Sequence, residues 1–540
     1  MIGVLATPPE VPVIREFFEL FKTPWELYRS GGRYDAVLTT GDDPVFAEAT
    51  PLIVIYSGRK LASDVKAGIE SIPRHIESLS YGDYTIPIYG GGIVFGSGSG
   101  LTDKESGKAV MCSRERLGGV TVRIGYNLFE EVRVLLTVGQ PVDNAAIPAL
   151  DLHIAVLRDL LATSVGPLIE IPPIPQCYRF VACLTHDMDH PSLRLHECDA
   201  TLLGFLYRAT VGSVVRVLRG RLSLRGLLRN WRVALKTPFV QVGLARDPWR
   251  DFVRYIKLEK GFPSTFFAIP FRNSRGQTHC GQLAPKRRAC RYRLTDITEE
   301  LRELMAGGCE IGLHGIDAWR DIGRGSEEMA AIRQISRTEK IGVRMHWLYF
   351  DTHSAATLEA GGADYDSTVG YNETIGYRAG TAQAYKPLET KQLLELPMQI
   401  MDTALFYPSY LNLTSKQARN CIGWLLDHAQ QSGGCVTVNW HDRSIAAERQ
   451  WGEFYVNLVE EMEKRGAWFA SASQAVAWFR MRRSVQFESV GQGKGVAGFK
   501  ITMDRKHDLP DLQLRIYDAP GSYRDIPVVE FMREHAALPT

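Results

Sequence analysis

Two aspartates, two residues apart, are the residues of this chain whose type and spacing point most directly to chemistry. Asp187 and Asp189 follow an apolar stretch at residues 180–184, which predicts a buried strand. Alternate residues of a strand project to the same side, so the two carboxylates would lie close together. Carboxylates at that distance repel each other unless a positive group lies beside them, and a divalent metal would be such a group. The alternative, from these residues alone, is a solvated turn followed by a helix N-cap.

Three later segments also carry a His or an Arg where an expected strand ends. His314 ends one of them, Arg344 and His346 end the second, and His441 ends the third. Together with the aspartates, these make four strand ends with ionisable side chains. Their order along the chain predicts that they converge at the carboxyl rim of a parallel α/β barrel, where such barrels keep their active sites.

In order and type, these motifs resemble those of the polysaccharide deacetylase family, which is carbohydrate esterase family four with the NodB homology domain. The resemblance implies that Asp187 is a general base and that Asp189 and His314 are metal ligands. It also implies that Arg344 holds the base in place and that His441 is the general acid.

The resemblance covers residues 176–485 and includes two further stretches of a divergent branch of the family. These are residues 364–368, with the sequence DYDST, and residues 394–397, with the sequence LELP. That branch includes proteins related to the urate pathway and to exopolysaccharide synthesis.

One position departs from the family pattern. The second motif usually contains two metal-binding histidines four residues apart, but position 318 is Ala318. The third protein ligand could then be Asp317, His346 or His190, and the sequence leaves this choice open.

The expected activity is hydrolysis of N-acetyl groups on amino sugars of a polysaccharide or glycan precursor. A divalent metal, zinc or else cobalt, nickel or manganese, would polarise the amide carbonyl and activate water. The base would take the proton of the water and the acid would protonate the leaving amine. Four aromatic residues near the motifs could stack on a sugar ring or could belong to the core: Trp319, Trp347, Tyr371 and Trp440.

Two other functions stay open. A catalytically impaired relative could bind a glycan or a partner protein without hydrolysis, as the Ala318 departure allows. A hydrolase of a small, non-glycan amide is the second, as the two divergent stretches suggest.

Composition bounds the class of protein. The 540 residues are 45% hydrophobic and 23% charged with a net charge of +2, which is typical of a soluble globular protein and gives no indication of nucleic-acid binding. We expect no membrane-length apolar run and no signal peptide. The nine cysteines contain no CxxC pair, which favours a reducing, cytoplasmic location. Peripheral contact of the cytoplasmic protein with a membrane is the alternative location.

We expect an α/β protein built of three regions. Residues 1–175 are an N-terminal α/β accessory domain, residues 176–485 a distorted parallel (β/α) barrel, and residues 486–540 a small C-terminal β region. The barrel assignment rests on alternating strand and helix patterns together with the family resemblance.

A basic helical insertion at residues 191–247 lies between the first two motifs. Residues 200–246 contain nine Lys or Arg and no Asp or Glu, with basic and leucine-rich stripes at helical spacing. The leucine stripe is made by Leu224, Leu227, Leu228, Trp231 and Leu235. Such an amphipathic basic helix predicts contact with an anionic membrane or an anionic polymer, or else packing of the leucine stripe on the protein's own core or on a second subunit.

Overall fold

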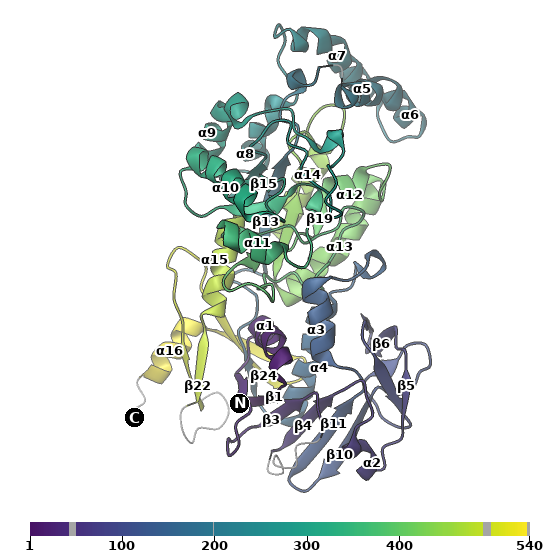
Figure 1. The fold of residues 1–540 in the computed structure, drawn as a ribbon, viewed down its shortest axis with the longest axis vertical. Helices are drawn as coiled ribbons and strands as arrows, with labels where there is room; N and C mark the ends of the chain where they lie inside the picture. Colours follow the sequence, from purple (N-terminus) through teal and green to yellow (C-terminus); the bar gives the residue numbers. More distant parts are fainter. Residues whose placement is uncertain (43–49, 198, 490–497, 537–540) are drawn as a thin grey trace. The chain divides into compact units, whose positions relative to one another are not determined.

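The chain folds into two compact units, each described here by itself. The computed structural model describes residues 1–42, 50–197, 199–489 and 498–536 (Figure 1). The first unit comprises Met1–Cys177, Tyr377–Leu388 and Trp478–Thr540, and the second comprises Tyr178–Gly376 and Glu389–Ala477. The C-terminal residues, expected to form a region of their own, therefore group with the N-terminal part of the chain.

The second unit is built on one sheet in which every strand pairing is parallel. Eight strands follow one another across the sheet, and a ninth, β21, pairs with β13 beside this path. In their order across the sheet, they are β18 (Leu394–Glu395), β17 (Tyr365–Asp366), β16 (Gly342–Met345), β15 (Glu310–Gly315), β14 (Ser264–Ala268), β13 (Phe180–Met188), β20 (Cys435–Asn439) and β19 (Ile400–Met401), with β21 at Ala467–Phe469.

This sheet must curl, because its two edge strands are neighbours in the chain. Eight flat strands would place β18 and β19 about 34 Å apart, at about 4.8 Å per step. The connection between them is residues 396–399, which can span at most about 17 Å. The expected parallel (β/α) barrel is therefore confirmed, in a form whose edge strands approach each other without pairing.

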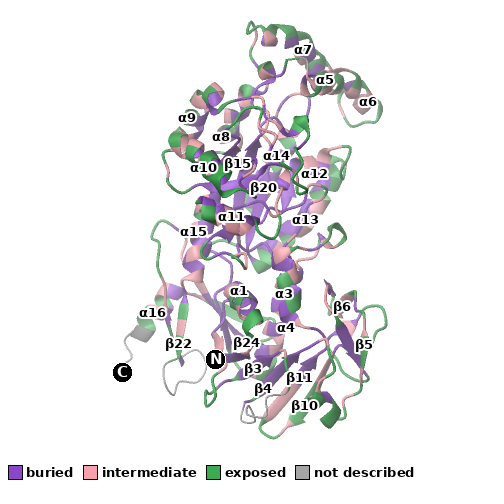
Figure 2. Ribbon diagram, in the orientation of Figure 1, coloured by how far each residue is buried: buried purple, intermediate pink, exposed green. Residues whose placement is uncertain are grey.

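Burial of β13 on both faces explains why its sequence is a continuous apolar run rather than an alternation. All nine residues of Phe180–Met188 are buried, and strands at the centre of the sheet in Figure 2 are likewise buried. Outside the basic insertion, the helices of this unit are α8 (Tyr255–Leu258), α9 (Thr298–Ala306), α10 (Ile322–Ser336), α11 (Ser354–Gly361), α12 (Asp402–Phe406), α13 (Ser415–Ser432) and α14 (Gly452–Lys464), and α15 (Ala472–Arg483) continues into the first unit.

The first unit contains a six-stranded mixed sheet and several smaller sheets. Across the large sheet the order is β10 (Met111–Arg116), β11 (Gly119–Ile124), β4 (Leu52–Tyr56), β3 (Ala36–Thr39), β1 (Ile2–Leu5) and β2 (Trp25–Leu27). The C-terminal strands β24 (Gln513–Ala519) and β25 (Ser522–Pro527) form a sheet with β12 (Leu168–Glu170). The remaining strands are β5 (Ser71–Arg74), β6 (Ser78–Tyr81), β7 (Tyr84–Pro87), β8 (Gly92–Phe95), β9 (Thr102–Asp103), β22 (Gln486–Ser489) and β23 (Phe499–Thr502), and the helices are α1 (Val11–Phe21), α2 (Ala62–Lys66), α3 (Leu128–Thr137), α4 (Ala149–Ser164) and α16 (Val528–Ala536).

The basic insertion of the second unit forms the helices α5 (Ala200–Tyr207), α6 (Ser213–Leu218) and α7 (Leu224–Gln241). The leucine stripe of α7 is largely exposed, with Leu224 at 67%, Leu228 at 64% and Leu235 at 77%. Smaller residues such as Ala234 provide the buried side of the helix instead. The stripe therefore does not pack on the core of this chain, which was one of the expectations (Figure 2).

One helical stretch among the described residues, Ala200–Leu218, is long and apolar enough to cross a membrane by length and composition. From the sequence we expected no apolar run of this length, and the stretch contains two charged residues, Arg208 and Arg216. They do not interrupt the helix, since the π-helical segment η5 (Arg208–Gly212) joins α5 to α6. A single stretch of this kind is weak evidence for a span.

Candidate functional site

The parallel register of the barrel brings the ionisable strand ends to one rim. His314 on β15 is paired with Arg344 on β16, and Thr185 on β13 is paired with Asn439 on β20. Asp187 lies two residues beyond Thr185, and His441 two residues beyond Asn439. Because all these strands run in one direction, their carboxyl ends share one edge of the barrel.

Asp187 is held by two donors from neighbouring strands. Its Oδ1 accepts a hydrogen bond from Arg344 Nη1 at 3.1 Å, and its Oδ2 accepts one from Asn439 Nδ2 at 2.7 Å. Burial alone would raise the pKa of this carboxyl, but the charges of His314 and Arg344 outweigh burial and lower it. Asp187 is thus an oriented carboxylate at neutral pH.

Arg344 is itself fixed by residues of the divergent stretches. Its Nε donates to the Ser367 carbonyl at 2.9 Å, and its Nη2 donates to the Ser367 hydroxyl at 2.9 Å. That hydroxyl donates to the carbonyl of Leu396 at 2.8 Å. The two stretches at residues 364–368 and 394–397 therefore hold the guanidinium that holds Asp187.

Asp189, His314 and His346 form an Asp–His–His cluster whose ligand atoms face one another. Asp189 Oδ1 lies 3.3 Å from His314 Nε2 and 3.2 Å from His346 Nδ1. The two nitrogens are 3.0 Å apart. These distances approach the edge of about 3.3 Å expected for a tetrahedron with metal–ligand bonds of about 2.0–2.1 Å.

The protonation of the cluster also fits a metal. His314 Nδ1 lies 2.9 Å from the Arg344 carbonyl, which can only accept, so Nδ1 carries the proton and Nε2 is free to bind a metal. Asp189 Oδ1 is buried and has no hydrogen-bond partner among the described residues. A buried carboxylate oxygen facing two imidazole nitrogens is the donor set of a divalent metal.

Of the three candidates for the third ligand, the structure brings His346 to the cluster. Asp317 Oδ1 instead accepts a hydrogen bond from the backbone N–H of Gln277 at 2.9 Å. His190 Nδ1 lies 3.3 Å from His196 Nε2. Ala318, in place of the usual second histidine, is fully buried.

His441 is paired with an aspartate that we had not identified from the sequence. Its Nδ1 lies 2.7 Å from Asp402 Oδ1, and its backbone N–H donates to Asp402 Oδ2 at 2.8 Å. Burial alone would lower the pKa of His441, but Asp402, with smaller contributions from Asp189 and Asp187, raises it to about 9. His441 is thus protonated at neutral pH, and its Nε2 lies 3.8 Å from Asp189 Oδ2.

Asp187, His441 and the Asp–His–His cluster line a single cavity of about 650 Å³, which we call the rim cavity. Trp347 also lines it, and two consecutive non-glycine residues, Trp347 and Leu348, have positive φ angles of 63° and 53° there. Left-handed backbone at such residues is costly and is concentrated at functional sites. The turn after β16 therefore has a strained conformation where it meets the cavity.

The other expected sugar contacts do not line the rim cavity. Trp440 is fully buried and stacks on Phe454, with ring centroids 6.0 Å apart. Trp319 is 2% exposed and packs against His279, and Tyr371 is 5% exposed. Of the four aromatic candidates, Trp347 is the one that a ligand in the cavity could reach.

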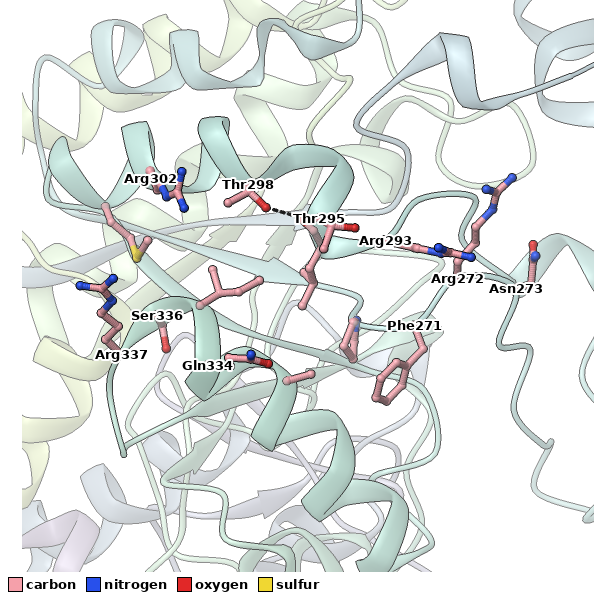
Figure 3. Close-up of a pocket in the computed structure, with 15 residues that line it drawn as sticks. Phe271, Arg272, Asn273, Arg293, Thr295, Thr298, Arg302, Gln334, Ser336 and Arg337 are labelled. Carbon is pink, nitrogen blue, oxygen red and sulfur yellow. Dashed lines mark hydrogen bonds between the residues drawn. The ribbon is translucent and has the colours of Figure 1, made fainter.

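A larger cavity of about 920 Å³ lies elsewhere in the barrel unit, between β14, α9 and α10 (Figure 3). Four arginines line it: Arg272, Arg293, Arg302 and Arg337. None of its described lining residues is a His, Asp, Glu or Cys, so it offers no metal ligand and no acid or base. We therefore place the chemistry in the smaller cavity.

Among the known proteins compared with this chain, only solved structures match it. No family model and no curated protein matches the chain. Matches were found among solved structures. They include polysaccharide deacetylases. Two of them, a putative one from Mycobacterium smegmatis and a probable one from Pseudomonas aeruginosa PAO1, are each 16% identical to this chain, with a TM-score of 0.35. The first match spans 58% of this chain and 95% of the matched protein. The second spans 57% of this chain and 93% of the matched protein.

The structure of Puue allantoinase also matches, at 14% identity and a TM-score of 0.34, over 57% of this chain and 92% of its own. At TM-scores below 0.5, we draw the function from the geometry of the rim cavity and not from these matches.

Proposed function

We propose that this chain is a metal-dependent hydrolase that removes N-acetyl groups from amino sugars of a polysaccharide or glycan precursor. The observation that carries the proposal is one cavity in which an oriented carboxylate, an Asp–His–His cluster and a protonated histidine converge. An amide needs each of these functions, since water is a weak nucleophile and an amine is a poor leaving group.

The metal-binding residues in this proposal are Asp189, His314 and His346. Zinc is the first candidate, with cobalt, nickel or manganese as others, because an Asp–His–His set suits all four. When bound, the metal would polarise the acetyl carbonyl and lower the pKa of the attacking water.

The remaining steps are assigned to residues of the chain. Asp187 takes the proton of the attacking water, while Arg344 and Asn439 keep its two oxygens in place. Water adds to the acetyl carbonyl, the C–N bond breaks, and His441 delivers a proton from Nε2 to the leaving nitrogen. Asp402 holds the Nδ1 proton of His441, so the Nε2 proton is the one presented to the cavity.

A substrate panel tests the proposal. The metal-loaded protein is expected to release acetate from N-acetylglucosamine oligomers and to leave allantoin unchanged, as followed by acetate detection and by loss of allantoin. Turnover of allantoin with no acetate from any N-acetylated sugar would establish the alternative, a hydrolase of a small amide. Sugar binding without turnover would establish the non-catalytic alternative.

We also propose that the insertion α5–α7 lets the protein bind the surface of an anionic membrane. Two features support this proposal: residues 200–246 contain nine basic and no acidic residues, and apolar side chains of these helices are exposed. The exposed apolar side chains include Leu203, Tyr207, Val211, Leu218, Leu224, Leu228, Trp231, Leu235 and Phe239. A substrate attached to a lipid would then be within reach of the same protein.

Sedimentation with liposomes checks the membrane proposal. At low salt, liposomes containing phosphatidylserine should pellet the protein, and phosphatidylcholine liposomes should pellet much less, because salt screens the basic residues less when it is dilute. The double substitution Leu228→Glu and Leu235→Glu should abolish pelleting. Leu283→Glu is the matched control, because Leu283 is 62% exposed outside the insertion. Failure of the wild-type protein to pellet with anionic liposomes would exclude the membrane as the partner of this helix. A wild-type dimer that the double substitution disrupts would exclude it as well.

A further inference from the structure

One wall of the rim cavity carries arginines that the proposed chemistry does not use. Arg443 and Arg449 line the cavity, and Arg443 is 9% exposed and Arg449 4% exposed. A third arginine, Arg287, lies over the ring of Trp347 at 5.4 Å. We call these three residues the arginine wall.

Among the residues that the structure describes, no carboxylate forms a salt bridge with either of the two buried guanidinium groups. Asp402, Glu448 and Asp442 lie near enough to raise the pKa of Arg449, and Asp442 acts in the same direction on Arg443. Among the described residues, the hydrogen bonds of Arg449 are long, at 3.5 Å to the Ser444 hydroxyl and 3.4 Å to the Tyr407 hydroxyl, and its guanidinium lies over the ring of Trp451 at 4.8 Å. Buried guanidinium groups without short hydrogen bonds are costly, so they are rare unless a ligand completes them.

Arg443 is the more exceptional of the two. Its Nη1 is buried and has no hydrogen-bond partner in the described part of the chain. Its guanidinium lies over the ring of Trp249 at 5.1 Å, which fixes its plane but satisfies none of its N–H groups. Burial and the neighbouring Arg449 lower its pKa to about 10, so the group is still charged at neutral pH.

Hydrogen bonds already engage most oxygens of the nearby acidic groups, and Glu448 Oε2 is the buried oxygen of this group that has no partner among the described residues. Asp442 Oδ1 accepts the backbone N–H of Arg443, and Asp442 Oδ2 accepts that of His190. Glu448 Oε1 accepts the indole N–H of Trp249 at 3.1 Å. Asp402 holds His441, as described above.

The electrostatic effect of the wall reaches a tyrosine in the same cavity. Arg449 first, then Arg443 and Arg208, lower the pKa of the Tyr407 phenol to about 8, against the effect of its burial. A phenol stabilised as an anion reports a positive potential at this wall. The carboxylates Asp187 and Asp189 line the same cavity, where Arg344 holds Asp187 and two imidazole nitrogens face Asp189.

We propose that the substrate carries an oxyanion, a carboxylate or a phosphate on or next to the N-acetylated sugar, which binds Arg443 and Arg449. Guanidinium groups bind planar or tetrahedral oxyanions through paired N–H donors, and these two present donors that the protein leaves unused. The inference rests on the proposed function, since it names the class of amino sugar that the site accepts. A cavity of about 650 Å³ is within the size range of small-ligand sites.

Calorimetric titration of the full-length protein in EDTA tests this inference, because EDTA excludes binding through a metal. The three probes are N-acetylglucosamine, N-acetylglucosaminuronic acid and N-acetylglucosamine 6-phosphate. At least one anionic probe should bind about 10-fold or more tightly than the neutral sugar, as a charge-assisted hydrogen bond allows. The carboxylate and phosphate arms identify which oxyanion the wall prefers.

Arg443→Met should remove the advantage of the anionic probe, and Arg443→Lys should keep part of it. Arg272→Met is the matched control, because Arg272 lines the separate arginine-containing cavity (Figure 3). Equal affinity of the wild-type protein for all three probes would overturn the inference. So would an anionic probe that binds more tightly than N-acetylglucosamine to Arg443→Met but not to Arg272→Met. If Arg443→Met does not fold, as judged by its thermal transition, Arg449→Met replaces it with the same expected loss.

Binding and turnover distinguish the two proposals. Tighter anion binding in EDTA, with no release of acetate by the metal-loaded protein from any N-acetylated sugar, would refute the deacetylase and leave the anion site in place. Release of acetate, with no preference for anionic sugars in binding, would refute the anion site and leave the deacetylase.

Discussion

Asp187→Asn is expected to lower kcat/KM for an N-acetylated sugar by about 10²- to 10⁴-fold, the usual contribution of a general base. The side chain is nearly the same size, but an amide cannot take a proton from water. Its NH₂ group must also face either Arg344 or Asn439, both of which are donors. We therefore expect a loss of stability of about 1–3 kcal/mol as well, from one unsatisfied buried donor.

Steady-state acetate release, with the metal content of each variant measured in parallel, checks this expectation. Asp187→Asn should retain its metal, because Asp187 is not part of the Asp–His–His cluster. Asp317→Asn is the control, as Asp317 is a carboxylate near the motif that contacts a backbone N–H outside the cluster. Wild-type turnover by Asp187→Asn would remove Asp187 from the mechanism.

His346→Ala is expected to lose metal and, with it, turnover. Substituting a residue that merely supports a ligand weakens metal binding by about 10- to 100-fold, so loss of a ligand should exceed about 100-fold. His314→Ala should behave alike, because both imidazole nitrogens face Asp189 Oδ1 at 3.2–3.3 Å. Competition with a chromophoric chelator measures the affinity directly.

Asp317→Ala distinguishes this assignment from its rival. The sequence left Asp317, His346 and His190 as candidates for the third ligand, and the structure brings His346 to the cluster. Asp317→Ala should therefore bind metal like the wild type. Loss of metal in Asp317→Ala, together with retention in His346→Ala, would reverse the assignment.

Much of the fold could be predicted because the positions of the buried parallel strands along the chain can be recognised from local patterns of apolar residues. The apolar run of β13 and the β-branched run of β20 are readable from the sequence, and each is followed at once by its ionisable residues. Parallel pairing then requires that these residues share one rim. That is why Asp187, His314, Arg344 and His441 could be expected together and do lie together in the rim cavity or beside it.

What could not be predicted depends on contacts between residues distant in sequence. Asp402 reaches His441 because β19, only two residues long, pairs with β20, and no local pattern marks that pairing. Asn439 lay within an identified motif, but its bond to Asp187 depends on the register with Thr185. A signal for Asp402 existed: it follows the LELP stretch after a short gap.

Burial was the other property that the sequence did not determine. Trp319 and Trp440 lie beside catalytic motifs, yet both belong to the core. Trp440 directly follows β20 and stacks on Phe454, and Trp319 lies in the turn after β15 and packs against His279. The leucine stripe of α7 has the spacing of a core face but is exposed. The C-terminal strands group with β12 because β24 pairs with it across more than 300 residues of chain.

The measurement that tests the central claim most directly is acetate release by the wild-type protein from N-acetylglucosamine oligomers, before chelation, after chelation and after zinc is returned. The account predicts that acetate is released with an equal amount of free amine, that chelation abolishes release, and that zinc restores it. Release that continues unchanged in the metal-free protein would contradict it, and so would the absence of release from the fully metal-loaded protein with any N-acetylated sugar, neutral or anionic.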